Sequence, residues 1–102
     1  MSDDADGPLF LVVTIKPRHD KLAEAEAQLQ SMRAATLQEE GCVFMHLVQS
    51  DDDGPDTWVM LEHFKSRAAW DEHMETTHNK EGNEILKDLL REPSDLRLYR
   101  EK

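Results

Sequence analysis

The chain has 102 residues, 38% of them hydrophobic, and a single cysteine, Cys42. Its formal net charge of -10, from 12 Lys and Arg against 22 Asp and Glu, repels phosphate backbones and anionic lipid headgroups, which disfavours nucleic-acid and membrane partners. No apolar stretch approaches the length that spans a bilayer, a lone cysteine cannot form an internal disulfide, and no secretion signal is recognisable, so the sequence predicts a cytoplasmic protein.

The N-terminal third predicts a tail, a strand and a helix. Residues 1–7 are small and acidic, so we expect a disordered tail ahead of one domain over residues 8–102. Residues 9–16 are rich in β-branched and aromatic side chains and predict a strand with cover on both faces. Apolar residues then recur at helical spacing over 22–36, which predicts an amphipathic helix that ends near Gly41.

Two more strands and an interrupted helical region follow. Residues 42–49 and 57–64 have strand composition, and the acidic turn residues between them predict a hairpin. Ser66 is placed to cap a helical region whose pattern falters near His78, so we expect two helical segments with a break. Apolar residues among charged neighbours at 96–99 predict a short last strand.

The resulting order, β-α-β-β-α-β, is that of the ferredoxin-like arrangement in the α+β class, in which helices cover one face of the sheet. The other face would carry side chains from nearly continuous apolar strands, and monomeric proteins rarely expose so large an apolar patch. A domain of this size also has a modest core. We therefore expect a homodimer in which a second sheet covers this face.

Glu62 is an anomaly in the third strand. Strand alternation puts it on one face with Trp58, Met60 and Phe64, where a carboxylate needs a partner or becomes protonated. His73 lies on the inward face of the second helical region and is a candidate partner. Two interpretations stay open: a buried pair that determines how the helix docks, or part of a functional site.

Other polar residues also need an interpretation. His78 lies at the helix break, where both a pocket mouth and an ordinary surface position fit. Arg33, on the edge of the first helix, could reach a substrate oxygen or pair with surface acids. No two histidines have the spacing of helical zinc ligands, so we expect no metal site. Cys42 has no basic partner, which favours inert packing.

Several stretches carry a family resemblance: residues 33–42 (RAATLQEEGC), 62–64 (EHF), 66–73 (SRAAWDEH) and 77–78 (TH). They resemble the antibiotic biosynthesis monooxygenase family. In that family, a glutamate near the end of the third strand precedes an aromatic residue two positions on and an alanine-rich helix with two histidines five apart. Glu62, Phe64, His73 and His78 fill these places, although the family usually has proline where this chain has Glu40.

The resemblance implies a dimeric α+β barrel, in which two sheets pack face to face, with one pocket per subunit between sheet and helices. It also implies varied chemistry, because relatives include cofactor-independent oxygenases of polycyclic phenols and quinols, a haem-degrading branch and a phospho-sugar isomerase. The haem-degrading branch has an asparagine on its first strand, and residues 9–16 contain none. The fold by itself does not determine the activity.

The leading hypothesis is oxidation of a small hydroxylated aromatic compound, such as a quinol or an anthrone, by O2 without any cofactor. Histidine changes charge near neutral pH, so His73 or His78 would be the base that deprotonates the substrate, with Glu62 orienting its ring. Three aromatic residues would stack on the substrate: Trp58, Phe64 and Trp70. The alternatives are an isomerase or tautomerase using the same pocket, and a non-enzymatic small-molecule-binding or stress-response dimer.

Overall fold

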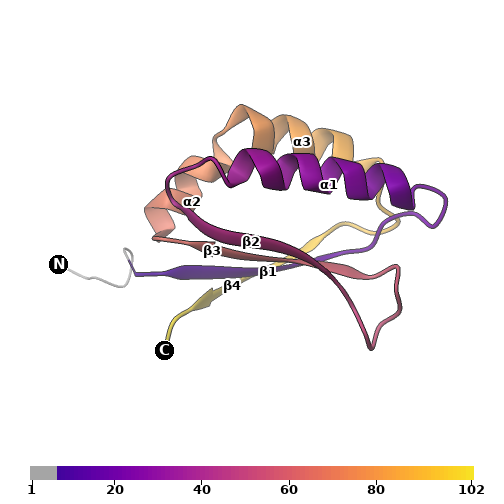
Figure 1. Ribbon diagram of the computed structural model, residues 1–102, viewed down its shortest axis with the longest axis horizontal. Coiled ribbons are helices and arrows are strands. Elements are labelled where there is room, and N and C mark those ends of the chain that lie inside the picture. Colours follow the sequence, from indigo (N-terminus) through magenta and orange to yellow (C-terminus); the bar gives the residue numbers. More distant parts are fainter. Residues whose placement is uncertain (1–6) are drawn as a thin grey trace.

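The computed structural model describes residues 7–102, so nearly all of the expected tail, residues 1–6, lies outside the described residues. Strands and helices follow one another in the predicted order, with the second helical region divided in two (Figure 1). The elements are β1 (Leu9–Ile15), α1 (Leu22–Thr36), β2 (Cys42–Gln49), β3 (Trp58–Phe64), α2 (Arg67–Met74), α3 (Thr77–Lys87) and β4 (Asp95–Arg100).

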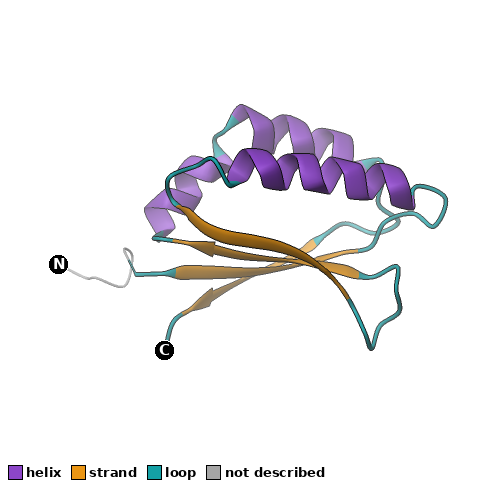
Figure 2. Cartoon of the chain, in the orientation of Figure 1, coloured by secondary structure: helices purple, strands orange, loops and turns teal. Residues whose placement is uncertain are grey.

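The four strands form one antiparallel sheet in the order β2-β3-β1-β4. The helices lie together on one face of this sheet (Figure 2), so the ferredoxin-like α+β fold is confirmed. β2 and β3 form the expected hairpin, and Gly54 in its acidic tip adopts a positive φ of 97°. Within residues 7–102, no helix has the length and apolarity that crossing a membrane requires.

Local signals determine where the helices begin and end. α1 ends at Thr36, earlier than expected, and residues 37–41 form a turn that leads into β2. The hydroxyl of Ser66 accepts a hydrogen bond from the backbone of α2 at 3.0 Å, which confirms the predicted cap. Thr76 caps α3 in the same way. The break between α2 and α3 therefore has its own capping residue.

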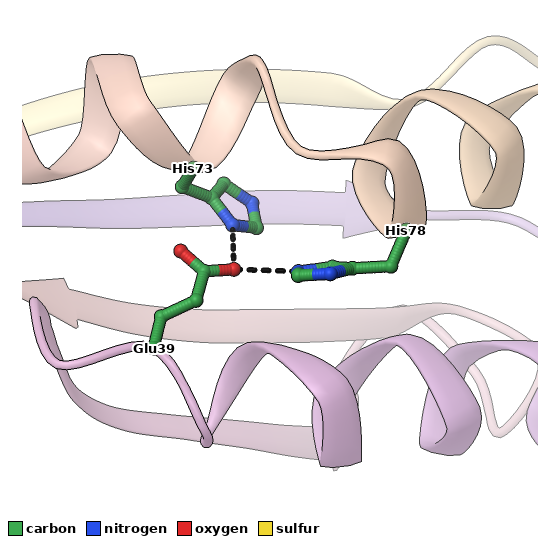
Figure 3. Close-up of side chains that lie close together, drawn as sticks. All are labelled: Glu39, His73 and His78. Carbon is green, nitrogen blue, oxygen red and sulfur yellow. Dashed lines mark hydrogen bonds and ion pairs between the residues drawn. The ribbon is translucent and has the colours of Figure 1, made fainter.

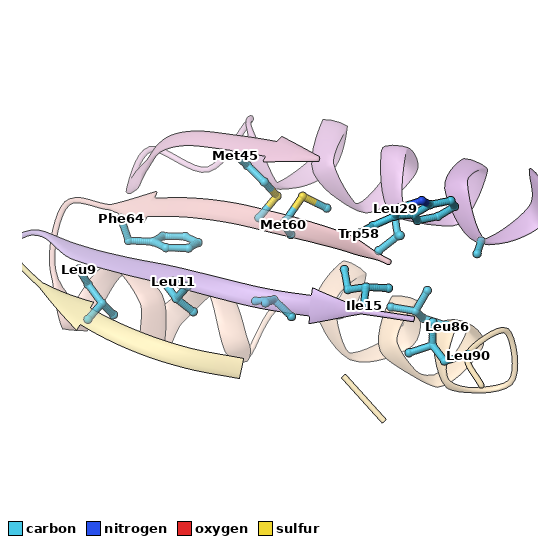
Figure 4. Close-up of a cluster of buried hydrophobic side chains, with 12 residues drawn as sticks. Leu9, Leu11, Ile15, Leu29, Met45, Trp58, Met60, Phe64, Leu86 and Leu90 are labelled. Carbon is cyan, nitrogen blue, oxygen red and sulfur yellow. The ribbon is translucent and has the colours of Figure 1, made fainter. Parts of the chain in front are cut away.

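The core lies between the helices and the inner face of the sheet (Figure 4). Alternate side chains of β1 and β3 are buried on this face, as the period of two predicts. Glu62 is among them, with 9% of the residue exposed. The buried apolar cluster contains Leu9, Leu11, Val13, Ile15, Ala25, Leu29, Met45, Trp58, Met60, Phe64, Leu86 and Leu90.

Among the described residues, no helix lies over the opposite face of the sheet, here called the outer face (Figure 1). The ring of His63 stacks on Phe10 with 4.3 Å between centroids, and Phe44 meets it edge-on at 5.2 Å. This is the apolar surface that a second sheet is expected to cover. By register and alternation, the outer face contains Phe10, Val12, Thr14, Phe44, His46, Val48, Val59, Leu61, His63, Asp95, Arg97 and Tyr99.

Gly41 brings the turn at residues 37–41 directly against α2. A β-carbon at Gly41 would lie 2.4 Å from the β-carbon of Ala69, a separation that real side chains do not tolerate. The carbonyl oxygen of Gly41 also accepts a hydrogen bond from the backbone N–H of Lys65 at 2.8 Å. The absence of a side chain therefore sets the distance between this turn and the helix.

We expect Gly41→Ala to lower the free energy of unfolding by about 1–3 kcal/mol, because the added methyl group overpacks the contact with Ala69. Urea denaturation measures this change. The control is Glu40→Ala at the exposed neighbouring position, expected to change stability by about 0.5 kcal/mol or less. If both substitutions change the free energy of unfolding equally, Gly41 does not lie close to Ala69 in solution.

Candidate active site

A cavity of about 100 Å³ lies between the inner face of the sheet and the helices. Most of its walls are apolar, with a small number of polar side chains among them, which is the usual composition of a small-molecule site. Four methionines contribute to the walls: Met32, Met45, Met60 and Met74. The polar lining residues are Thr36, Glu62, His73, Asn79, Asn83 and Ser94.

Glu62 is the only carboxylate that lines this cavity among the residues described. Within residues 7–102, no group forms a hydrogen bond or ion pair with its side chain. Burial, followed by repulsion from the Glu39 carboxylate, raises the pKa of Glu62 from its ordinary value of 4.5 to about 7. An acid that titrates near neutral pH and faces a cavity is suited to accept a proton from a bound molecule.

Glu39 connects the two candidate histidines (Figure 3). It lies in the turn after α1, whereas His73 lies in the last turn of α2 and His78 in the first turn of α3. Its Oε2 atom is 2.9 Å from Nδ1 of His73 and 2.6 Å from Nε2 of His78. The predicted pair of Glu62 with His73 is therefore wrong, because the turn after α1 brings a different carboxylate to the ring.

The bond to Glu39 also determines which nitrogen of His73 carries hydrogen. An ionised carboxylate only accepts, so Nδ1 of His73 is the donor and Nε2 of the neutral ring is an acceptor. Nε2 has no partner among residues 7–102, and the ring lines the cavity. His78 does not line the cavity, and 32% of its side chain is exposed. His73 alone of the two histidines can meet a ligand there directly.

The three aromatic residues expected to stack on a substrate lie in different places. Trp70 lines the cavity, and the guanidinium of Arg67 lies 5.0 Å from the centroid of its ring. Phe64 is fully buried beside His73, with 5.0 Å between ring centroids, and does not line the cavity. Trp58 lies at the opposite end of β3, where its Nε1 donates to a backbone carbonyl of the hairpin tip.

Arg33 and Cys42 do not line the cavity either. The Nε of Arg33 donates a hydrogen bond to the carbonyl oxygen of Met45 on β2, and within residues 7–102 Arg33 forms no ion pair with a surface acid. Burial, then repulsion from Glu62 and Glu39, raises the pKa of the Cys42 thiol to about 11. A thiol that stays protonated at neutral pH is a poor nucleophile, as inert packing predicts.

Sequence reasoning missed three polar residues of this region. Glu39 lies in a turn without periodicity, beside the exposed Glu40, so nothing in the pattern distinguishes the two acids. Asn79 and Asn83 carried a readable signal, since amides four positions apart share one helical face. The Nδ2 of Asn83 donates to the backbone and side-chain oxygens of Asn79 at 2.9 and 3.2 Å.

Known proteins are similar to this chain in sequence and in fold. Residues 8–85 match the family described as "Antibiotic biosynthesis monooxygenase". Rv0793 of Mycobacterium tuberculosis is 31% identical over 86 residues, which cover 84% of this chain and 83% of that protein. Its solved structure superposes with a TM-score of 0.88 and 27% identity, covering 94% of this chain and 96% of that one.

Two further relatives extend the comparison. The structure of a conserved protein from Methanosarcina mazei Go1 has a TM-score of 0.89 and 26% identity, covering 97% of each chain. The Synechocystis protein sll1783 is 29% identical over 96 residues, and the match covers 94% of this chain but 65% of that longer relative. The chain belongs to the antibiotic biosynthesis monooxygenase family.

Proposed function

We propose that the chain is a cofactor-independent monooxygenase that oxidises a hydroxylated aromatic compound, of the quinol or anthrone type, with O2. One observation carries the proposal: Glu62 lines a largely apolar cavity, has a pKa of about 7, and has no partner among residues 7–102. Membership of the family supports oxygen chemistry as the use of this site. A base near neutrality is what deprotonation of such a substrate requires.

In the proposed reaction, Glu62 accepts a proton from the phenol or from the activated carbon of the substrate. Burial and the neighbouring Glu39 disfavour charge on Glu62, so proton transfer moves the negative charge onto the delocalised substrate anion. The anion then supplies the electrons that reduce O2. For an anthrone, the methylene carbon loses two hydrogens and gains one oxygen atom, and the second oxygen atom leaves as water.

His73 and Trp70 would position the substrate, and Glu39 would position His73. Nε2 of His73 can accept a hydrogen bond from a substrate hydroxyl, because Glu39 holds the hydrogen of the ring on Nδ1. Trp70 offers an aromatic surface in the cavity wall. His78 would act through Glu39, whose carboxylate it helps to hold in place. The proposed base is therefore Glu62, in place of the two histidines expected from the sequence.

The cavity must widen to hold an aromatic ring. Its volume is about 100 Å³, whereas a protein cavity that binds benzene measures about 150 Å³. The four methionines of the walls have flexible side chains that adapt to different contents. We expect their side chains to move when a substrate binds.

Oxygen uptake with a menadiol-type quinol, and separately with an anthrone, tests the proposal. The expected result is protein-dependent O2 consumption that matches the product formed. If the protein converts a compound at the same rate without O2, the oxygenase proposal is wrong and the isomerase or tautomerase is supported. If the protein binds these compounds but converts none of them with or without O2, the oxygenase proposal is wrong and the non-enzymatic dimer is supported.

We expect His73→Ala to slow oxidation about tenfold, because one hydrogen bond to the substrate is lost. His78→Ala should slow it about threefold or less, since His78 lies outside the cavity. Steady-state rates with the same substrate measure both effects. If both variants lose the same fraction of the oxidation rate, His73 acts as His78 does, by holding Glu39, and not by contact with the substrate.

We also propose a homodimer formed through the outer face, because its centre is apolar and no element within residues 7–102 covers it. Leu61→Lys, at its centre, is expected to convert the dimer into a monomer in sedimentation experiments. The control is Ile85→Lys on α3, which alters an apolar residue exposed at 54% on the helical side. A monomeric wild-type chain, or equal effects of both substitutions, would contradict this assembly.

A further inference from the structure

We propose that Glu39, His73 and His78 form a binding site for a divalent transition-metal ion such as Zn²⁺. Each residue offers one donor atom, and these three atoms lie within 4.8 Å of one another. The site is distinct from the proposed deprotonation at Glu62, and its occupancy does not depend on that chemistry. Spacing along the sequence did not indicate it, because the three donors come from a turn and from two different helices (Figure 3).

Two of the three distances between the donors are close to those of one coordination sphere. The two imidazole nitrogens lie 2.9 and 2.6 Å from Oε2 of Glu39. Metal bonds of about 2.0–2.1 Å separate neighbouring ligands by about 3.0–3.4 Å, depending on the geometry. To bind an ion, the carboxylate oxygen and the two nitrogens need to move apart by a few tenths of an ångström, at the expense of the hydrogen bonds that now join them. The two imidazole nitrogens, which lie within 4.8 Å of each other, must come to within about 3.4 Å.

The donor set and its surroundings suit a borderline metal ion. Two imidazoles and one carboxylate bind Zn²⁺, Fe²⁺ and similar ions, and they leave positions open for water or another ligand. The exposed fractions of the side chains are 17% for Glu39, 7% for His73 and 32% for His78, so the group is largely buried and reached past His78. His73 also lies in the last turn of α2, where the helix dipole favours positive charge.

The chain holds these donors in place before any ion binds. Ser66 and Thr76 cap the two helices that carry the histidines. The contact of Gly41 with Ala69 holds the turn that carries Glu39 against α2. Three donors held by separate rigid elements lose little conformational freedom on binding, which favours affinity.

Metal binding would change what His73 presents to the cavity. An ion on Nδ1 replaces the hydrogen there, so the neutral ring carries its hydrogen on Nε2 and becomes a donor in place of an acceptor. This consequence rests on the proposed function, in which Nε2 accepts a hydrogen bond from the substrate. Binding of the ion itself does not depend on the proposed function.

Calorimetric titration of Zn²⁺ into the whole chain tests the site, with no substrate present. The expected result is one ion per chain, bound at least about tenfold more weakly by Glu39→Gln and by His78→Ala. His19→Ala is the matched control, because Nδ1 of His19 pairs with a carboxylate oxygen of Asp56 at 2.8 Å but offers only two donors. That variant should bind Zn²⁺ like the wild type.

Titration with Co²⁺ gives an independent readout, because its visible spectrum reports the ligands. The spectrum should change in His78→Ala, and circular dichroism checks that this variant keeps the fold. The proposal fails if the wild type binds no Zn²⁺, or if Glu39→Gln and His78→Ala bind it as tightly as the control. Since binding is measured without turnover, lack of oxygenase activity would leave this result intact.

Discussion

A Glu62→Gln variant is expected to oxidise its substrate about 10²- to 10⁴-fold more slowly than the wild type, the usual contribution of a positioned base. The amide keeps the size of the side chain but cannot accept the proton. The wild-type rate should rise with pH through about 7, as Glu62 loses its own proton, and then level off. The variant should lack this rise.

The pH dependence of kcat/KM for both proteins measures this effect. Glu72→Gln is a matched control, because it removes an exposed carboxylate from α2 beside His73 without changing the cavity. Its profile should match that of the wild type. If kcat/KM of Glu62→Gln still rises with pH as in the wild type, Glu62 is not the base, and His73 becomes the candidate.

The same substitution should make the protein more stable above neutral pH, by an amount that approaches roughly 3 kcal/mol. The pKa of Glu62 is higher in the folded chain, about 7, than its ordinary value of 4.5. Between these values the folded state holds a proton that the unfolded state releases, so stability falls as pH rises. Below pH 4.5 this loss is absent, and above about 7 it is complete.

Urea denaturation of the wild type and Glu62→Gln at several pH values between 4.5 and 8 measures the effect. The difference between the two free energies of unfolding should grow with pH and become constant above about 7. For a domain of this size, even one third of the full effect would move the melting temperature by several degrees. Parallel pH curves would show that Glu62 has a partner in solution.

The two predictions at Glu62 follow from strand alternation, which the sequence displays directly. The period of two in β3 placed Glu62 on the buried face, and burial is the main cause of its raised pKa. Ser66 was equally readable, because a cap depends only on residues close in sequence. The fold could be predicted since each of its elements carries such a local signal.

The contacts between elements could not be read in this way. Alternation predicted the correct face for Trp58 but not its distance along β3 from the cavity, which depends on where the helices cross the sheet. His73 was expected to meet Glu62, yet its partner Glu39 comes from a turn whose approach to α2 has no periodic signature. The contact of Glu39 with His73 and His78 depends on how the turn after α1 packs against α2 and α3, and the spacing of residues along the sequence does not show this packing.

The contact of Gly41 with Ala69 limits how relatives of this chain can exchange parts. A side chain at position 41 fits only if the residue at position 69 becomes smaller, so we expect relatives without glycine at 41 to have glycine at 69. A chimaera that takes its second helix from a relative with a larger residue at position 69 would push the preceding turn outward, and Glu39 with it. In such a chimaera we expect the hydrogen bond between Glu39 and His73 to be lost, because the turn and the helix that carry them would separate.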